Sequence, residues 1–122
     1  MKPKFYSLIL KSMSFMSYRF MRVLIMFDLP VETKAQVRTY TRFRKELIKE
    51  GFLMLQYSIY IKSCINKEAA LGSVRSVNRF LPRDGHVRSL IITERQYENM
   101  MILVGEEDRN IEILGDNRTI MF

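Results

Sequence analysis

Residues 22–30, with the sequence RVLIMFDLP, decide how this chain folds. The apolar run from Val23 to Phe27 is rich in residues that favour β-strands, and such an uninterrupted run is typical of a strand buried on both faces of a sheet. The strand must end near Asp28, because Pro30 has no amide hydrogen to donate to a neighbouring strand. A carboxylate held at the end of a rigid strand is a common place for chemistry, so Asp28 is the candidate catalytic and metal-binding residue.

The composition of the chain indicates one folded domain with a basic surface. Its 122 residues are enough for one core and too few for two, and 48% of them are hydrophobic. There are 20 lysines and arginines against 13 aspartates and glutamates, which gives a formal net charge of +7. This excess of positive charge favours a polyanionic partner such as nucleic acid, although charge alone does not identify one.

Few side chains of this protein are suited to bind a transition metal. The single cysteine, Cys64, excludes an intrachain disulfide and a cysteine-rich zinc site, and the single histidine, His86, excludes a histidine cluster. Carboxylates remain as metal ligands, and sites made only of oxygen atoms favour magnesium or manganese. No apolar run approaches the roughly 20 residues of a membrane span, so we expect a cytoplasmic protein without a membrane partner.

Both ends of the chain are expected to lie outside the main domain. Residues 1–16 begin like a signal peptide, with Lys2 and Lys4 before an apolar stretch, but that stretch is short and Lys11 interrupts it. We therefore expect residues 1–16 to be a poorly ordered extension or a docking segment, and residues 17–104 to be the folded domain. Residues 105–122 are expected to form a separate C-terminal segment.

A helix is predicted after Pro30. Thr33 and Gln36 have the spacing of a capping box, and Gly51 is a typical helix end. The predicted inner face consists of Val37, Tyr40, Phe43, Leu47 and Ile48. The outer face carries a row of cations within an arc of about 80°, at a step of about 100° per residue. These cations are Lys34, Arg38, Arg42, Lys45 and Lys49.

The row of cations has two interpretations. Every amphipathic helix needs a polar outer face, and lysine and arginine fill such a face without any special purpose. However, Glu46 and Glu50 are the only acidic residues of this predicted helix, so the cations do not alternate with opposite charge. We favour contact with the phosphates of nucleic acid, which gives affinity and salt dependence without sequence readout.

The remainder of the chain is predicted to alternate between strands and helices. Residues 52–62 are typical of one long strand, or of two strands folded at Gln56. Asn66 is the predicted cap of a helix that ends near Leu81, with two outward nucleic-acid contacts, Arg75 and Arg79. The inward residues of this helix are Ala70, Leu71, Val74, Val77, Phe80 and Leu81. Residues 86–92 and 100–104 are the last predicted strands, separated by a short helix that Thr93 caps.

This order favours an α+β sandwich, in which helices cover one face of an antiparallel sheet. A ferredoxin-like fold has the order βαββαβ. The predicted order of strand, helix, strand, helix, strand and strand matches it imperfectly. Either residues 93–99 supply the second helix of the fold, or residues 52–62 form two strands.

Six short motifs resemble one known family. They are residues 17–22 (SYRFMR), 26–30 (MFDLP), 40–45 (YTRFRK), 50–52 (EGF), 56–60 (QYSIY) and 93–97 (TERQY). Their order resembles the CRISPR-associated protein two family, and in detail the branch found beside the large RNA-guided effector nuclease. The resemblance covers roughly residues 16–105.

The resemblance implies partners and an activity. Members of that family are ferredoxin-like homodimers at the centre of the spacer-integration complex, where they hold double-stranded prespacer DNA and bridge two dimers of the CRISPR integrase subunit. Other adaptation proteins are open as further partners. Members are also described as magnesium-dependent endonucleases acting on RNA or duplex DNA, with the aspartate after the first strand, here Asp28, as metal ligand. Their C-terminal segment crosses to the partner subunit, which here implies residues 111–114 or 119–122.

The residue types themselves leave the role of Asp28 open. One carboxylate is a poor magnesium site, whereas a two-fold axis beside Asp28 would supply a second carboxylate. The alternative is that Asp28 caps the adjacent loop, and no general base is evident in the sequence. The acidic residues 106–108 are a solvated loop, an integrase contact or a metal cluster, and His86 is expected to be structural.

Two functional classes follow. In the first, the chain is a dimeric scaffold whose basic faces bind the backbone of a short duplex while a separate integrase performs the chemistry. In the second, a pair of Asp28 side chains with Mg²⁺ hydrolyses phosphodiesters. A single-strand RNA-binding module is disfavoured, because the predicted strand over residues 87–92 lacks the aromatic side chains that stack on bases. We favour the scaffold.

Overall fold

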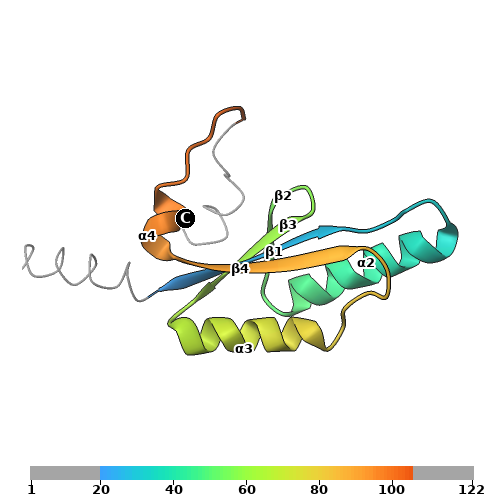
Figure 1. Ribbon diagram of the computed structural model, residues 1–122, viewed down its shortest axis with the longest axis horizontal. Helices are drawn as coiled ribbons and strands as arrows, with labels where there is room; N and C mark the ends of the chain where they lie inside the picture. The colour runs from blue at the N-terminus through green and yellow to red at the C-terminus, as the bar shows by residue number, and fades with distance from the viewer. Residues whose placement is uncertain (1–19, 106–122) are drawn as a thin grey trace, which may run out of the picture.

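The computed structural model of the chain describes residues 20–105 (Figure 1). Several expectations concern residues outside this part: the N-terminal extension, the acidic residues 106–108 and the exchanged strand at residues 111–114 or 119–122. The boundaries drawn at residues 16 and 105 also stay predictions.

The elements of the described part follow the order βαββαβ and end with a short helix. They are β1 (Met21–Asp28), α2 (Lys34–Lys49), β2 (Leu53–Gln56), β3 (Ile59–Cys64), α3 (Lys67–Asn78), β4 (His86–Thr93) and α4 (Glu94–Glu98). Every pair of neighbouring strands is antiparallel, and the order across the sheet is β2-β3-β1-β4. The long helices α2 and α3 lie on the same side of the sheet (Figure 1). The α+β class is confirmed, and the element order is that of a ferredoxin-like fold.

Residues 52–62 form two strands rather than one. β2 ends at Gln56 and β3 begins at Ile59, with a tight turn between them. Ser58 in this turn has φ of 63°, and its carbonyl oxygen accepts a 3.1 Å hydrogen bond from the amide of Phe27. The second of our two alternatives is therefore right. Because α3 is the second helix of the fold, the assignment of that role to residues 93–99 is wrong.

The strand predicted over residues 100–104 is not formed. The residues there are exposed, from 46% for Met100 to 95% for Val104. The chain leaves the sheet through α4 directly after Thr93, so this apolar run has no strand beside it within the described part. Apolar composition predicted a strand, but a strand also needs a neighbour to accept and donate its backbone hydrogen bonds.

One face of β1 forms the main core against the helices. Val23, Ile25 and Phe27 are buried there together with Phe43 and Leu47 of α2. The Phe27 ring makes edge-on contacts with the rings of Phe43 and Tyr40, at centroid distances of 5.1 and 5.9 Å, and stacks on Tyr60 at 5.7 Å. Full burial of each large apolar side chain contributes about 1.5–3 kcal/mol.

The opposite face of β1 is also covered, although by a smaller cluster. Leu24 is buried there against Ile61 of β3. Partly buried side chains surround this pair, among them Leu55, Ile92 and Tyr97 of α4. The prediction that the strand over residues 22–27 is buried on both faces is confirmed for Leu24 as well as for its neighbours in the main core.

Both long helices begin as predicted but bury a narrower stripe. Thr33 and Gln36 form the predicted capping box of α2, Gly51 follows the helix with φ of +98°, and Asn66 caps α3 through the amide of Ala69. Four of the predicted inward residues are instead exposed: Val37, Ile48, Leu71 and Leu81. The first three lie about 85° or more from the centre of the buried stripe of their helix. Leu81 follows the end of α3 at Asn78.

Candidate nucleic-acid interface and carboxylate site

Asp28 is the last residue of β1, and its side chain is exposed. Gly85, in the loop before β4, packs against the backbone of Asp28 and has φ of +91°. A Cβ atom on Gly85 would lie 2.6 Å from the carbonyl oxygen of Asp28 and 2.7 Å from Cδ2 of Leu29. Only glycine fits this close approach without a shift of the neighbouring chain, so the loop before β4 fixes the point at which β1 ends.

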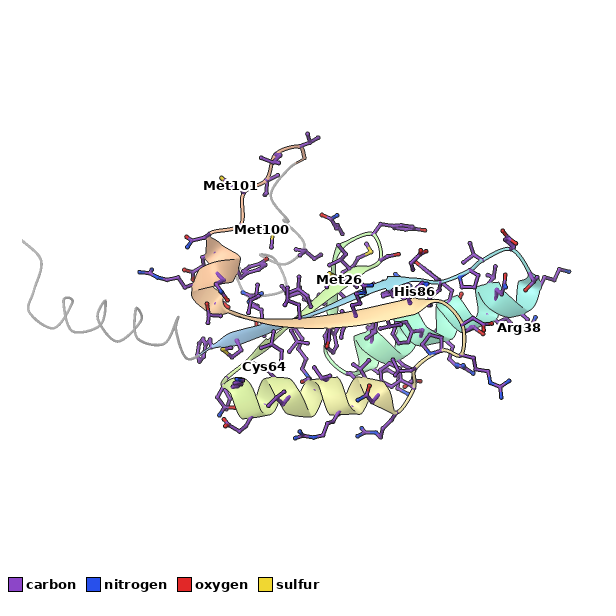
Figure 2. The ribbon with its side chains drawn as sticks, viewed as in Figure 1. Met26, Arg38, Cys64, His86, Met100 and Met101 are labelled. Atoms are coloured by element: carbon purple, nitrogen blue, oxygen red, sulfur yellow. The ribbon has the colours of Figure 1, made fainter. Side chains whose placement is uncertain are left out.

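His86 is the cross-strand partner of Asp28 in the β1–β4 pair. Directly opposed residues of an antiparallel pair present their side chains on the same face, with Cβ atoms about 4.5–5.5 Å apart. Both residues line one shallow depression, together with Met26, Ser58 and Arg88. The expectation that His86 is structural is not supported, since His86 is exposed (Figure 2) and is the cross-strand partner of Asp28.

The described part of the chain does not by itself complete a metal site at Asp28. Within residues 20–105 no three histidine, cysteine, aspartate or glutamate side chains come together in a way that could hold an ion. A magnesium ion commonly uses one or two carboxylates, several waters and the phosphates of a substrate. Asp28 suits the role of one such carboxylate, because its side chain has no hydrogen bond or ion pair to the described part of the chain. The remaining ligands of an ion at Asp28 would be water, a substrate phosphate or a carboxylate from outside the described part of this chain.

The row of cations predicted on α2 is exposed along its whole length. Its members are Lys34, Arg38, Arg42, Lys45 and Lys49. Among the described residues only Lys49 of this row has an acidic partner, Glu46, at 3.7 Å. Arg38 lies on the outer side of α2, away from the sheet (Figure 2). Arg75 and Arg79, the two cations predicted on α3, are exposed as well.

The structure does not bring this row of cations and Asp28 together on one face. The core side chains Val23, Ile25 and Phe27 point from β1 toward α2, so Leu24, Met26 and Asp28 point to the opposite face of the sheet. The cations stand on the side of α2 that faces away from the core. A polyanion bound along most of the row would therefore lie across the sheet from the Asp28 carboxylate of the same chain.

Sequence reasoning missed two residues beside Asp28, namely His86 and Arg88. The residues of β1 and β4 are about sixty positions apart, and only the register of the sheet shows that they are neighbours. The usable signal was that His86 is the first residue of its strand, since the start of an antiparallel neighbour lies beside the end of β1.

None of the helices in residues 20–105 has the length and apolar character needed to span a membrane.

The fold and the site define a small, basic, ferredoxin-like protein with an exposed carboxylate at the end of its first strand. The profile of the family described as CRISPR associated protein Cas2 matches residues 21–100, and the chain belongs to this family. The resemblance noted in the sequence is thereby confirmed.

Individual relatives agree with this assignment. The chain is 44% identical over 101 residues to the CRISPR-associated endoribonuclease Cas2 of Ligilactobacillus salivarius, a match that covers 83% of this chain and 100% of the relative. It is 46% identical to the protein of the same name from Lacticaseibacillus rhamnosus, covering 83% and 99%. A solved structure described as the crystal structure of cas2 shares 19% identity, with coverage of 83% and 98% and a TM-score of 0.49.

Proposed function

We propose that this chain is a CRISPR adaptation protein that acts as a dimeric scaffold. In this role it binds the backbone of double-stranded prespacer DNA and bridges dimers of the CRISPR integrase subunit. Family membership supports a place in the CRISPR system. The structural observation that carries the proposal is the row of exposed cations on α2, which stands across the sheet from Asp28.

The dimensions of the row suit a duplex. α2 has 16 residues, and at 1.5 Å per residue its cations extend over roughly 22 Å. At 3.4 Å per base pair this length corresponds to roughly six to seven base pairs. Contacts of this kind fix the position of a duplex and carry no sequence information, which is what a scaffold for many different spacers requires.

Exposed apolar side chains support a homodimer. The C-terminal end of the described part is apolar, and each of its apolar residues is at least 46% exposed. These residues are Met100, Met101, Ile102, Leu103 and Val104. The sheet face opposite the long helices adds Leu90, which is half exposed, and the adjoining turn adds Tyr57. A surface of this kind favours protein contact, and a second copy of the chain is the partner proposed here. The proposal includes exchange of a C-terminal strand between the two copies.

A second candidate function is a magnesium-dependent endonuclease that uses Asp28 from both subunits. The relatives in Ligilactobacillus and Lacticaseibacillus are named endoribonucleases. The exposed carboxylate and the neighbouring Arg88 support this candidate, because both suit a site that receives a phosphate. A magnesium ion held by Asp28 would supply an activated water and neutralise phosphate charge. RNA and duplex DNA both remain candidate substrates.

Asp28→Ala distinguishes the two candidates. With purified integrase and a short duplex, the scaffold proposal predicts that this variant integrates the duplex as well as the natural chain does. Loss of integration, with circular dichroism and dimer mass unchanged, would overturn the scaffold proposal in favour of chemistry at Asp28. Cleavage of a labelled RNA that requires Mg²⁺, and that Asp28→Ala abolishes, would support the nuclease.

A further inference from the structure

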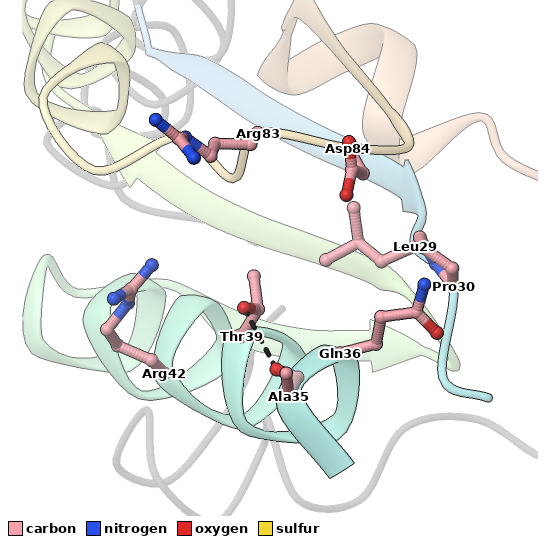
Figure 3. Close-up of a pocket in the computed structure, with 8 residues that line it drawn as sticks. All are labelled: Leu29, Pro30, Ala35, Gln36, Thr39, Arg42, Arg83 and Asp84. Atoms are coloured by element: carbon pink, nitrogen blue, oxygen red, sulfur yellow. Dashed lines mark hydrogen bonds between the residues drawn. The ribbon is translucent and has the colours of Figure 1, made fainter. Parts of the chain in front are cut away.

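A pocket outside the Asp28 depression lies between the start of α2 and the loop that leads into β4 (Figure 3). Its apolar wall is made by Leu29 and Pro30, which follow β1. Arg42 of α2 and Arg83 of the loop lie at one end of the pocket, and Asp84 and Gln36 lie toward the other (Figure 3). Neither the interpretation of Asp28 nor that of the cation row accounts for this arrangement.

The two arginines form the cationic end of the pocket. Both side chains line the pocket, Arg42 from α2 and Arg83 from the loop across it (Figure 3). Neither has an ion pair with a residue of the described part. Guanidinium groups offer several N–H donors in a planar fork that matches phosphate oxygens, so two of them at one gap suit a phosphate group.

The other end of the pocket offers both a donor and an acceptor. Oε1 of Gln36 accepts hydrogen bonds from the amides of Glu32 and Thr33, at 2.9 and 3.0 Å. These bonds fix the side-chain amide and leave its nitrogen free to donate within the described part. The carboxylate of Asp84 is free to accept there. A donor and an acceptor beside an apolar wall suit the edge and the face of a nucleobase.

The size of the pocket suits a single base better than a base pair. The cavity measures about 150 Å³. A cavity of about that volume in another protein holds a single benzene molecule, so a stacked base pair does not fit. Since Arg42 also belongs to the row of cations on α2, a strand that follows the row reaches the pocket without a gap.

We propose that this pocket binds one unpaired nucleotide, with its phosphate between Arg42 and Arg83 and its base against Leu29 and Pro30 beside Asp84. The inference rests on the proposed function, since the nucleotide belongs to a strand whose duplex part lies along α2. The site therefore marks the place where the duplex held by this protein opens into a single strand.

The test compares a blunt duplex with the same duplex carrying a short single-stranded tail, using the full chain and fluorescence anisotropy. We expect the tailed duplex to bind about tenfold more tightly, because stacking of one base and its phosphate contact add to duplex binding. A tail with the same phosphates but without bases should retain only part of this gain. Arg83→Ala should remove the preference for the tail and leave the affinity for the blunt duplex unchanged.

Arg44→Ala is the matched control, because Arg44 is an exposed arginine of α2 that does not line the pocket. Equal binding of blunt and tailed duplexes by the natural chain would overturn the inference. An equal loss for both duplexes in Arg83→Ala would also overturn it, since Arg83 would then be one more contact to the duplex.

A separate measurement keeps the inference independent of the proposed function. If the natural chain binds neither duplex, the scaffold proposal fails. Titration of the full chain with guanosine monophosphate, followed by NMR, then still tests the pocket. Shifts confined to the amides of residues 29–42 and 83–84 support it, and the absence of shifts overturns it.

Discussion

Arg22 of β1 donates two hydrogen bonds to Glu94 at the start of α4. Nε of Arg22 lies 2.6 Å from Oε1 of Glu94, and Nη2 lies 2.8 Å from Oε2. The guanidinium also stacks on the ring of Tyr97, 4.1 Å from its centroid. These contacts attach α4 to the sheet and place Tyr97 over the smaller core cluster of Leu24 and Ile61.

Removal of one partner of this ion pair is expected to destabilise the fold. Arg22 is only 7% exposed, so Glu94→Ala leaves a buried guanidinium without its carboxylate. Loss of one partner of such a pair commonly costs about 3 kcal/mol, which urea denaturation measures directly. Glu98→Ala is the control, because it removes an exposed glutamate from the same helix. Equal stability of the two variants would show that the Arg22–Glu94 pair contributes nothing to the fold.

The Arg22–Glu94 pair also shows what the sequence predicts and what it leaves out. The motifs at residues 17–22 and 93–97 were each recognisable, and Thr93 was predicted to cap the short helix. The contact between them was not predictable, because it joins residues 72 positions apart and depends on the register of β1 with β4. No contact of Arg22 was predicted from the sequence, whereas the structure buries this residue at 7% exposure.

The dependence on contacts between distant residues also explains which helices and strands the sequence predicted correctly. β1, α2 and the start of α3 were predicted because apolar periodicity and capping residues are local signals. Residues 100–104 have equally strong apolar composition, yet no strand of the described part lies beside them. At the site, Asp28 was predicted from Pro30, while His86 and the pair of Arg42 and Arg83 depend on tertiary packing.

Gly85→Ala is expected to disturb the end of β1. The new Cβ would lie 2.6 Å from the carbonyl oxygen of Asp28, and φ of +91° is strained for alanine. We expect a loss of roughly 2 kcal/mol of stability and altered NMR shifts for Asp28 and His86, since strain at one backbone position costs about 1–3 kcal/mol. The control is Gly72→Ala in α3, where the added Cβ meets only the end of the Arg75 side chain at 3.7 Å. Unchanged shifts in Gly85→Ala would show that Gly85 does not position Asp28.

Charge reversal on α2 tests the contact with duplex DNA. Arg38→Glu removes a cation from the centre of the row, and we expect duplex affinity to fall about tenfold. Loss of one phosphate contact also reduces the slope of log K against log salt by about 1. Arg44→Glu makes the same charge change on the same helix, about 120° around the axis from Arg38. If both variants lose affinity equally, net charge rather than the row holds the duplex.

Metal binding at Asp28 is expected to require two copies of the chain. Residues 20–105 contain no cluster of three candidate ligands, so we expect a stable site to use a carboxylate from each of two subunits, or to add the oxygen atoms of a bound phosphate. Titration with Mn²⁺ followed by electron paramagnetic resonance should therefore give one ion per two chains, and Asp28→Asn should abolish this binding. Glu32→Gln is the control, because it removes an exposed carboxylate near the same strand end. One ion per chain that survives Asp28→Asn would place the metal away from β1 and remove the physical basis for a nuclease centred on this carboxylate.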